Sequence, residues 1–117
     1  MVMYKEKVVL CGANSYEEKY YLNPDFERLP DSVKNELKIM CVLYVHDVGG
    51  ILTLVYEEDG SLCFEVTSKE GDPMFDDIGS RLKIKQMRRD KAELLEALQM
   101  YYQVFFLGNE GGSVLCY

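Results

Sequence analysis

The strongest helical pattern lies near the C-terminus of the chain. Apolar residues recur there at helical spacing, namely Leu94, Leu95, Leu98, Tyr101, Tyr102 and Phe105. This spacing places all six on one face of an α-helix. Asp90 and Glu93 form a weak capping-box pattern at its start, and Gly108 supplies a stop. The pattern predicts a helix over residues 90–107.

A second helix is predicted over residues 31–47. A proline, an aspartate and a serine at 30–32 suit its start, and the glycine pair at 49–50 suits its end. One face carries the apolar residues Val33, Leu37, Met40, Cys41, Tyr44 and Val48. After the second turn the other sides are apolar too, through Ile39, Val42, Leu43 and Val45. Such a helix is either sandwiched in the core or covered by a partner chain.

Residues 51–57 and 61–67 form the clearest predicted hairpin, because Asp59-Gly60 between two apolar runs favours a two-residue type I′ turn. Pairing about that turn places Val55 opposite Phe64, Thr53 opposite Val66 and Tyr56 opposite Cys63. The face expected to meet the helices then consists of Thr53, Val55, Leu62, Phe64 and Val66. The other face, expected to be partly wet, combines Leu52, Leu54 and Tyr56 with Glu65 and Thr67.

The N-terminal third contains two further segments with strand character. Residues 8–13 are predicted to form a strand. Residues 16–23 fit either a short helix or a strand, and their tyrosines and the following proline favour the strand. The second helix also has an alternative, in which 38–45 is a strand that turns at 49–50 into 51–56.

Between the hairpin and the last helix the pattern is weaker. A turn is expected at Asp72-Pro73, and the apolar spacing predicts a short helix over 74–82. Residues 83–89 fit no single pattern, because 81–85 alternates as an edge strand would. The whole chain then has the order ββαββαα, an α+β two-layer sandwich in which helices cover one face of an antiparallel sheet.

Length and charge limit the classes of function. The 117 residues correspond to one domain, 1–117, with an ordered core expected over about 5–108 and a flexible tail over 109–117. Thirteen Lys and Arg against 20 Asp and Glu leave a net charge of -7, which disfavours nucleic-acid and anionic-membrane binding. The longest mostly apolar stretch, 39–45, is too short to span a bilayer, and no secretory leader pattern is present. A cytoplasmic location without membrane contact is expected.

The four cysteines show no metal-binding spacing. Cys11, Cys41, Cys63 and Cys116 form no C-x-x-C pair, and one histidine cannot complete a local zinc signature. The first three lie among apolar neighbours and are expected to be buried. Cys116 is expected to be the reactive one. No metal and no cofactor is predicted.

No catalytic arrangement is found in the sequence. His46, the only imidazole, ends a predicted helix next to Asp47 and is interpreted as structural. Cys41, five residues earlier, points in a different direction on that helix. The acidic cluster over 57–77 lacks EF-hand spacing, and only Glu65, in mid-strand, is a candidate for acid–base chemistry. The chain is therefore not expected to be an enzyme.

The most unusual charge feature is a basic segment over residues 81–91. Six of the 13 basic residues fall there, namely Arg81, Lys83, Lys85, Arg88, Arg89 and Lys91. They are candidate contacts for an anion or a partner, and the acidic 57–77 region of the same or a neighbouring chain is the expected partner. Contact with phosphate or RNA is less favoured, because no aromatic residue interleaves for base stacking and no glycine-rich phosphate loop occurs.

Four segments carry a family resemblance: Val8–Asn14, Leu37–Tyr44, Val48–Leu54 and Arg81–Lys85. Together they resemble a small uncharacterised family from Gram-positive anaerobic bacteria, over about Lys5 to Gly108. That family is a domain of unknown function, so the resemblance implies no activity, ligand or site, and at most a stand-alone cytosolic bacterial protein. The element order from the second helix onward is also similar to that of roadblock and profilin-like folds, an analogy of fold only.

The expected function is that of a small cytosolic interaction or regulatory domain without enzymatic activity. Nine tyrosines, four of them near the N-terminus, favour an interface, since tyrosine is enriched there. The predicted all-round apolar helix needs a cover, so self-association as a homodimer is expected, with a protein partner as a further expectation. The alternative is a module that binds a small anionic ligand or nucleic acid through residues 81–91.

Overall fold

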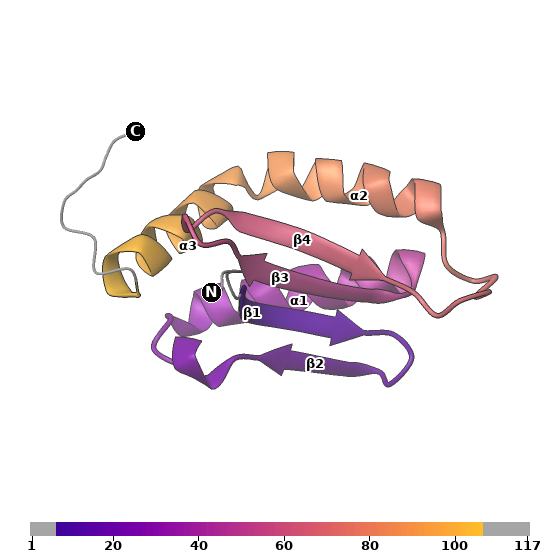
Figure 1. Ribbon diagram of the computed structural model, residues 1–117, viewed down its shortest axis with the longest axis horizontal. Coiled ribbons are helices and arrows are strands. Elements are labelled where there is room, and N and C mark those ends of the chain that lie inside the picture. Colours follow the sequence, from indigo (N-terminus) through magenta and orange to yellow (C-terminus); the bar gives the residue numbers. More distant parts are fainter. Residues whose placement is uncertain (1–6, 107–117) are drawn as a thin grey trace, which may run out of the picture.

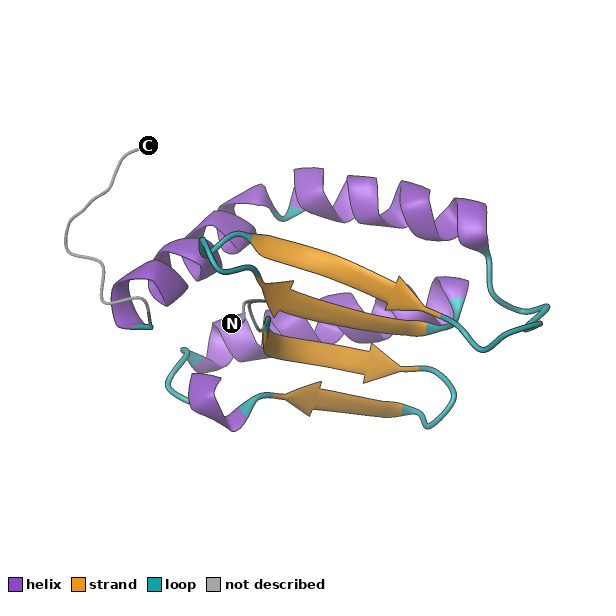
Figure 2. Cartoon of the chain, in the orientation of Figure 1, coloured by secondary structure: helices purple, strands orange, loops and turns teal. Residues whose placement is uncertain are grey.

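Four strands and three helices follow one another in the computed structural model, which describes residues 7–106. Their bounds are β1 (Val8–Asn14), β2 (Lys19–Leu22), α1 (Asp31–Val48), β3 (Ile51–Tyr56), β4 (Leu62–Thr67), α2 (Asp77–Asp90) and α3 (Ala92–Phe105). The strands form one antiparallel sheet in the order β2-β1-β3-β4 (Figure 1). The helices lie on one side of that sheet (Figure 2). The α+β class and the order ββαββαα are confirmed.

α1 lies across the sheet and supplies much of the core. Leu37, Cys41 and Tyr44 of α1 are fully buried, as are Leu52 and Leu54 of β3. The helix residues recur three and four positions apart and the strand residues alternate, so each element turns one apolar face inward. Each such side chain contributes roughly 1.5–3 kcal/mol by leaving water. No helix within residues 7–106 combines the length and apolarity needed to cross a membrane.

Aromatic rings fasten α3 to the hairpin end of the sheet. The rings of Tyr56 and Tyr102 stack with centroids 4.1 Å apart, and Phe26 stacks on Phe106 at 4.7 Å. Phe26 belongs to a short 3-10 turn between β2 and α1. The buried Tyr56 hydroxyl donates a hydrogen bond to the Leu98 carbonyl at 2.8 Å. Ring pairs of this kind add about 0.5–1.5 kcal/mol beyond their burial.

The turn between β3 and β4 is one residue longer than predicted. Its three loop residues are 58–60, because the Glu57 N–H donates to the Ser61 carbonyl at 2.8 Å and the Gly60 N–H donates to the Glu57 carbonyl at 3.0 Å. Gly60 has φ 92°, the left-handed conformation that closes a type I turn with a bulge. The predicted type I′ turn is therefore wrong.

The longer turn shifts the predicted hairpin register by one residue, which exchanges the two faces of β3. Tyr56 pairs with Leu62 and Leu54 pairs with Phe64. The helix-facing side consists of Leu52, Leu54 and Tyr56 with Leu62, Phe64 and Val66, and the opposite side holds Thr53, Val55, Cys63 and Glu65. The predicted face of β3 is wrong, whereas that of β4 is confirmed.

α2 begins later and ends later than predicted. Asp76 caps it by accepting a hydrogen bond from the Gly79 N–H at 2.8 Å, so the preceding residues stay outside the helix. The helix then continues to Asp90, and the edge-strand alternative for 81–85 is wrong. Met87 packs into the core from this helix, which supplies the apolar contact that keeps the whole segment helical.

Two other predictions change at element boundaries. α3 begins at Ala92, so Asp90 ends α2 rather than starting the last helix. The strand alternative for 38–45 is wrong, since these residues lie within α1, whereas the favoured strand in 16–23 is confirmed by β2. Gly108 and the predicted tail over 109–117 lie outside the described residues.

Candidate functional site

The basic segment lies along α2 and just beyond its end, and half of it faces other elements. Lys83 Nζ lies 2.7 Å from Asp47 Oδ2, and Lys91 Nζ lies 2.8 Å from Glu36 Oε2. α1 and α2 run side by side in opposite directions (Figure 1), so cations along α2 meet acids at opposite ends of α1. The prediction that the acidic 57–77 region is the partner is wrong for these two lysines. Exposed pairs of this kind add little to stability, because water screens the two charges.

The remaining cations of the segment point in other directions. Arg88 lies over the Phe64 ring, 4.8 Å from its centroid. Arg81 pairs with Asp77, a member of the acidic region, at 3.5 Å. Two more face solvent, namely Lys85 and Arg89. Successive positions on a helix point roughly 100° apart, so one anion cannot meet all six side chains.

α1 has a second apolar face, directed away from the sheet. Ile39, Val42 and Leu43 are 58%, 40% and 54% exposed, and these three residues form the α1 outer face. Asn35 and His46 share that side of the helix by their spacing. The helix is therefore apolar on both its buried and its exposed sides, as the sequence pattern predicts.

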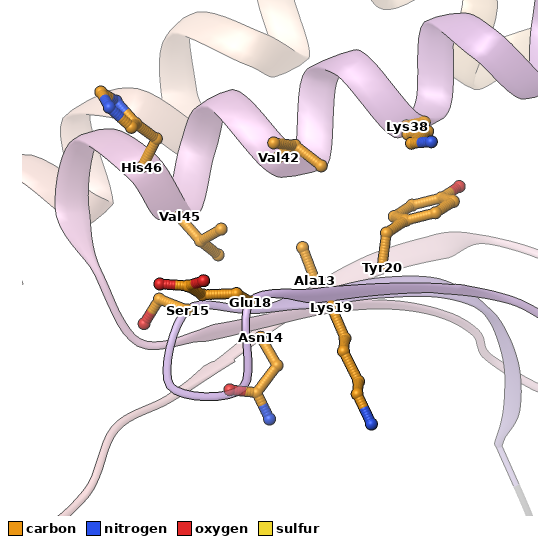
Figure 3. Close-up of a pocket in the computed structure, with 10 residues that line it drawn as sticks. All are labelled: Ala13, Asn14, Ser15, Glu18, Lys19, Tyr20, Lys38, Val42, Val45 and His46. Carbon is orange, nitrogen blue, oxygen red and sulfur yellow. The ribbon is translucent and has the colours of Figure 1, made fainter.

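A pocket of about 550 Å³ lies between α1 and the turn that joins β1 to β2 (Figure 3). Its apolar walls are Ala13 of β1 and Val42 and Val45 of α1. Lys38 and Tyr20 stand at one end, and Glu18 and His46 stand at the other (Figure 3). Its volume is in the usual range for small-ligand sites. The walls offer apolar contact and separated charges.

Tyr20 of this pocket also belongs to a buried group that includes two thiols. Cys11 and Cys41 are fully buried with their Sγ atoms 3.9 Å apart, which confirms the predicted burial. Hydrogen bonding to Cys11 and burial raise the pKa of the Cys41 thiol, and burial raises the pKa of Tyr20. The Tyr20 hydroxyl has no hydrogen-bond partner among the described residues. Raised pKa values keep these groups protonated, so they are poor nucleophiles.

Cys63 is only half-buried, contrary to the prediction. The hairpin register places it on the sheet face opposite the helices, where burial and a hydrogen bond with Glu57 raise its pKa. Glu65 lies on the same face and pairs with Lys7 Nζ at 2.6 Å, so this predicted acid–base candidate is an exposed ion pair. Cys116, the predicted reactive cysteine, lies outside the described residues.

His46 is exposed, with Nδ1 3.3 Å from Asp47 Oδ1. Cys41, the nearest thiol along the helix, is buried on the opposite side, so the two do not form a nucleophile–base pair. In the part of the chain that the structure describes, no group of three or more His, Cys, Asp or Glu side chains is placed to hold a metal ion. The candidate functional features are thus the α1 outer face and the pocket between α1 and the turn that joins β1 to β2.

Sequence reasoning missed the pocket and the position of Arg88 beside Phe64. Both arise where elements distant in sequence meet, and neither has a local motif. The hairpin loop contained one usable signal, since a glycine after three polar residues also suits a three-residue turn with a bulge. That choice would have placed Leu54 on the helix-facing side of the sheet, opposite Phe64.

Comparison with known proteins assigns the chain to a family but not to an activity. The model of a family of unknown function (DUF6145) matches residues 7–110. The chain belongs to this family. The predicted resemblance to an uncharacterised family is thereby confirmed over nearly the same residues. No curated protein and no solved structure matches the chain, so the similarity to roadblock and profilin-like folds stays a prediction.

Proposed function

We propose that this chain is a small interaction domain without enzymatic activity, and that it forms a homodimer through the α1 outer face. The observation that carries the proposal is the exposure of Ile39, Val42 and Leu43 on a helix whose other face is already buried. Clustered exposed apolar side chains on soluble domains commonly mark interaction sites. The fold of a single chain does not need these three side chains to be apolar.

Charge favours this face as the place where two copies meet. The net charge of -7 makes two copies repel each other over most approaches. Two acids of α1 beside the α1 outer face, Glu36 and Asp47, are paired with lysines of α2 at less than 3 Å. Contact at this face therefore brings neither of these two carboxylates together with its copy as an unpaired charge.

The three side chains of the α1 outer face are too few to bury the area of a stable interface, so the contact must extend beyond them. A specific interface buries roughly 1,200–2,000 Å² in total. α1 has 18 residues and is about 27 Å long, and the neighbouring α2 exposes Ile78 and Leu82. A two-fold pairing of the helical layer would use this same surface on both chains.

The proposal includes a cytoplasmic setting in a bacterial cell. A reducing compartment would keep Cys11 and Cys41, whose Sγ atoms lie 3.9 Å apart, as thiols. The bacterial source rests on the family resemblance alone.

The basic segment gives no comparable support for binding an anion or nucleic acid. Lys83 and Lys91 are held by acids of α1, and Arg81 by Asp77. Of the remaining three cations, Arg88 lies over the Phe64 ring and Arg89 pairs with Asp90 at 3.7 Å, which weakens a common site for phosphate groups. The protein–protein function is therefore the one that the geometry favours.

The test is sedimentation velocity on Leu43→Glu and on a matched control, Val104→Glu. Leu43 and Val104 are 54% and 52% exposed on different helices, so both changes place a carboxylate at an equally open position. Leu43→Glu should weaken dimerisation at least about 30-fold, because loss of a central apolar contact costs about 2 kcal/mol or more. Val104→Glu should leave it unchanged.

Two results would contradict this proposal. A dimer that persists unchanged in Leu43→Glu would exclude the α1 outer face. Equal weakening by both variants would indicate general charge repulsion rather than a defined contact. Circular dichroism on each variant checks that the fold is retained.

A further inference from the structure

The outer edge of β4 carries main-chain groups that the sheet does not use. In an antiparallel pair, successive residues direct their N–H and C=O groups alternately toward and away from the partner strand. The Leu62 N–H donates to Gln99 Oε1 at 2.9 Å, and the Leu62 carbonyl accepts from Arg88 at 3.5 Å. Leu62 therefore points away from β3. Phe64 and Val66, two and four residues later, point the same way.

A groove of about 380 Å³ lies beside these groups, between β4 and α2. Phe64 and Val66 line one wall, and Ser80 and Ile84 of α2 line the other, with Phe75 also at its border. Figure 1 shows α2 running along the outer side of β4. One wall thus offers main-chain donors and acceptors, and the other offers polar groups together with the apolar side chains of Ile84 and Phe75.

We propose that this groove binds an extended segment of a partner protein, which adds to the sheet as a fifth strand beside β4. Phe64 and Val66 each offer one N–H and one C=O to that segment. Peptides that add to a sheet edge gain affinity from such main-chain bonds and specificity from contacts with alternate side chains. Apolar residues at alternate positions of the segment pack against Ile84 and Phe75.

Charge indicates that the incoming segment is acidic. Arg88 lies at the Leu62 end of the edge, and no carboxylate within residues 7–106 pairs with it. The other charges of the groove, Asp77 and Arg81, are paired with each other. An Asp or Glu of the segment next to Arg88 gains a charge-assisted hydrogen bond.

A second copy of this chain fits the edge less well than an acidic peptide does. Two-fold pairing of β4 through Phe64 and Val66 centres on Glu65. The Glu65 side chains of the two copies would then lie opposite each other, and like charges in that position destabilise a sheet. The Arg88 side chains would also remain without acids. Strand addition is therefore independent of the dimer proposed through α1.

The probe is a fluorescein-labelled hexapeptide of alternating threonine and valine with one terminal glutamate, placed to meet Arg88 and not Glu65, titrated with the full chain and followed by fluorescence anisotropy. Replacing its glutamate by lysine should weaken binding at least about tenfold. Methylating alternate amide nitrogens removes either the donors that face β4 or those that face away, depending on the pattern chosen. One pattern should weaken binding at least about tenfold, and the other should leave it within about threefold.

Two matched pairs of variants locate the site. Val66→Pro removes an N–H that faces the groove and none that bonds to β3, and proline is tolerated at sheet edges. It should weaken binding at least about tenfold, whereas Val66→Ala, which keeps the N–H, should bind nearly as the wild type. Arg88→Gln should remove the preference for glutamate over lysine peptides, and Arg89→Gln on the exposed side of α2 should keep it.

Three results would overturn the proposal. The first is absence of binding by both hexapeptides at about 1 mM, well above the range of weak peptide recognition. The second is equal binding by the two methylated peptides. This result overturns the proposal even if Val66→Pro fails to fold. The third is a dimer lost in Val66→Pro but kept in Val66→Ala, which would assign the edge to a second copy. Leu43→Glu should bind the peptide normally, so the two proposals fail separately.

Discussion

The two faces of α1 are both apolar, yet the fold uses only one of them. Leu37, Cys41 and Tyr44 on the inner face are fully buried against the sheet, whereas Ile39 and Leu43 on the outer face are more than half exposed. The inner face holds the chain together. The side chains of the outer face are similarly apolar, but they pack against far less of their own chain. Apolar character on the inner face serves the folding of one chain, and on the outer face it supports the proposed contact between chains.

The comparison is tested most strongly by making the same substitution on each face. Leu37→Ala should lower the free energy of unfolding by about 2–5 kcal/mol, because it leaves a cavity among packed side chains. Leu43→Ala should change it by less than about 1 kcal/mol in dilute solution, where the chain is monomeric. Urea denaturation measures both. Similar losses at the two positions would mean that the outer face is part of the folding core.

Thiol labelling compares an inner-face residue with a residue on the side of the sheet opposite the helices. In a Cys116→Ser background, Cys63 should react with a disulfide reagent at least about 100-fold faster than Cys41 and Cys11, which need an opening of the structure. Mass spectrometry of digested samples identifies the labelled cysteine. Rapid native labelling of Cys41 would contradict the buried inner face.

A buried polar contact extends the inner face toward α2. The Tyr44 hydroxyl is hydrogen-bonded to the Ser80 hydroxyl, and both groups are buried. Tyr44→Phe leaves Ser80 without this partner and should cost about 1–2 kcal/mol. Tyr21→Phe, on the exposed side of the sheet, is the control and should cost less than about 0.5 kcal/mol. Thermal unfolding measures the loss of stability in both variants. Equal losses would mean that the Tyr44 contact with Ser80 has no special role.

The smallest expected effect comes from the ion pair between Asp47 and Lys83. The Lys83 ammonium lowers the pKa of Asp47, so its stabilising contribution is present above the unfolded pKa of about 3.9 and is lost as pH falls through the lower folded value. Asp47→Asn should lower the Tm at pH 7 by about 1–2 °C, and this difference in Tm should shrink as the pH falls below about 3.9. Asp25→Asn is the control. A difference in Tm that stays constant with pH would show that the charge of Asp47 is not its cause.

The sequence predicted elements with strong periodicity well and positions set by turns poorly. The apolar spacing from Val33 to Val48 placed α1 correctly, because a helix repeats the same contact over several turns. The side of the sheet that β3 turns inward depended on one extra loop residue at Gly60. Since side chains alternate along a strand, an error of one residue reversed the whole face.

The candidate sites follow the same division. The α1 outer face was visible in the sequence as a helix with too many apolar positions, because its signal is local. The groove at β4 depends on the docking of α2, which places Arg88 at Leu62. No local pattern encodes that meeting of elements distant in sequence, so it required the structure.

The central claim is that the α1 outer face joins two chains, and sedimentation equilibrium of the unmodified protein tests it most directly. Measured from about 1 to 100 μM, the mean mass should rise toward twice the 13.5 kDa of a single chain and go no further, as expected for a closed two-fold dimer. A mass that stays at 13.5 kDa across this range would contradict the account.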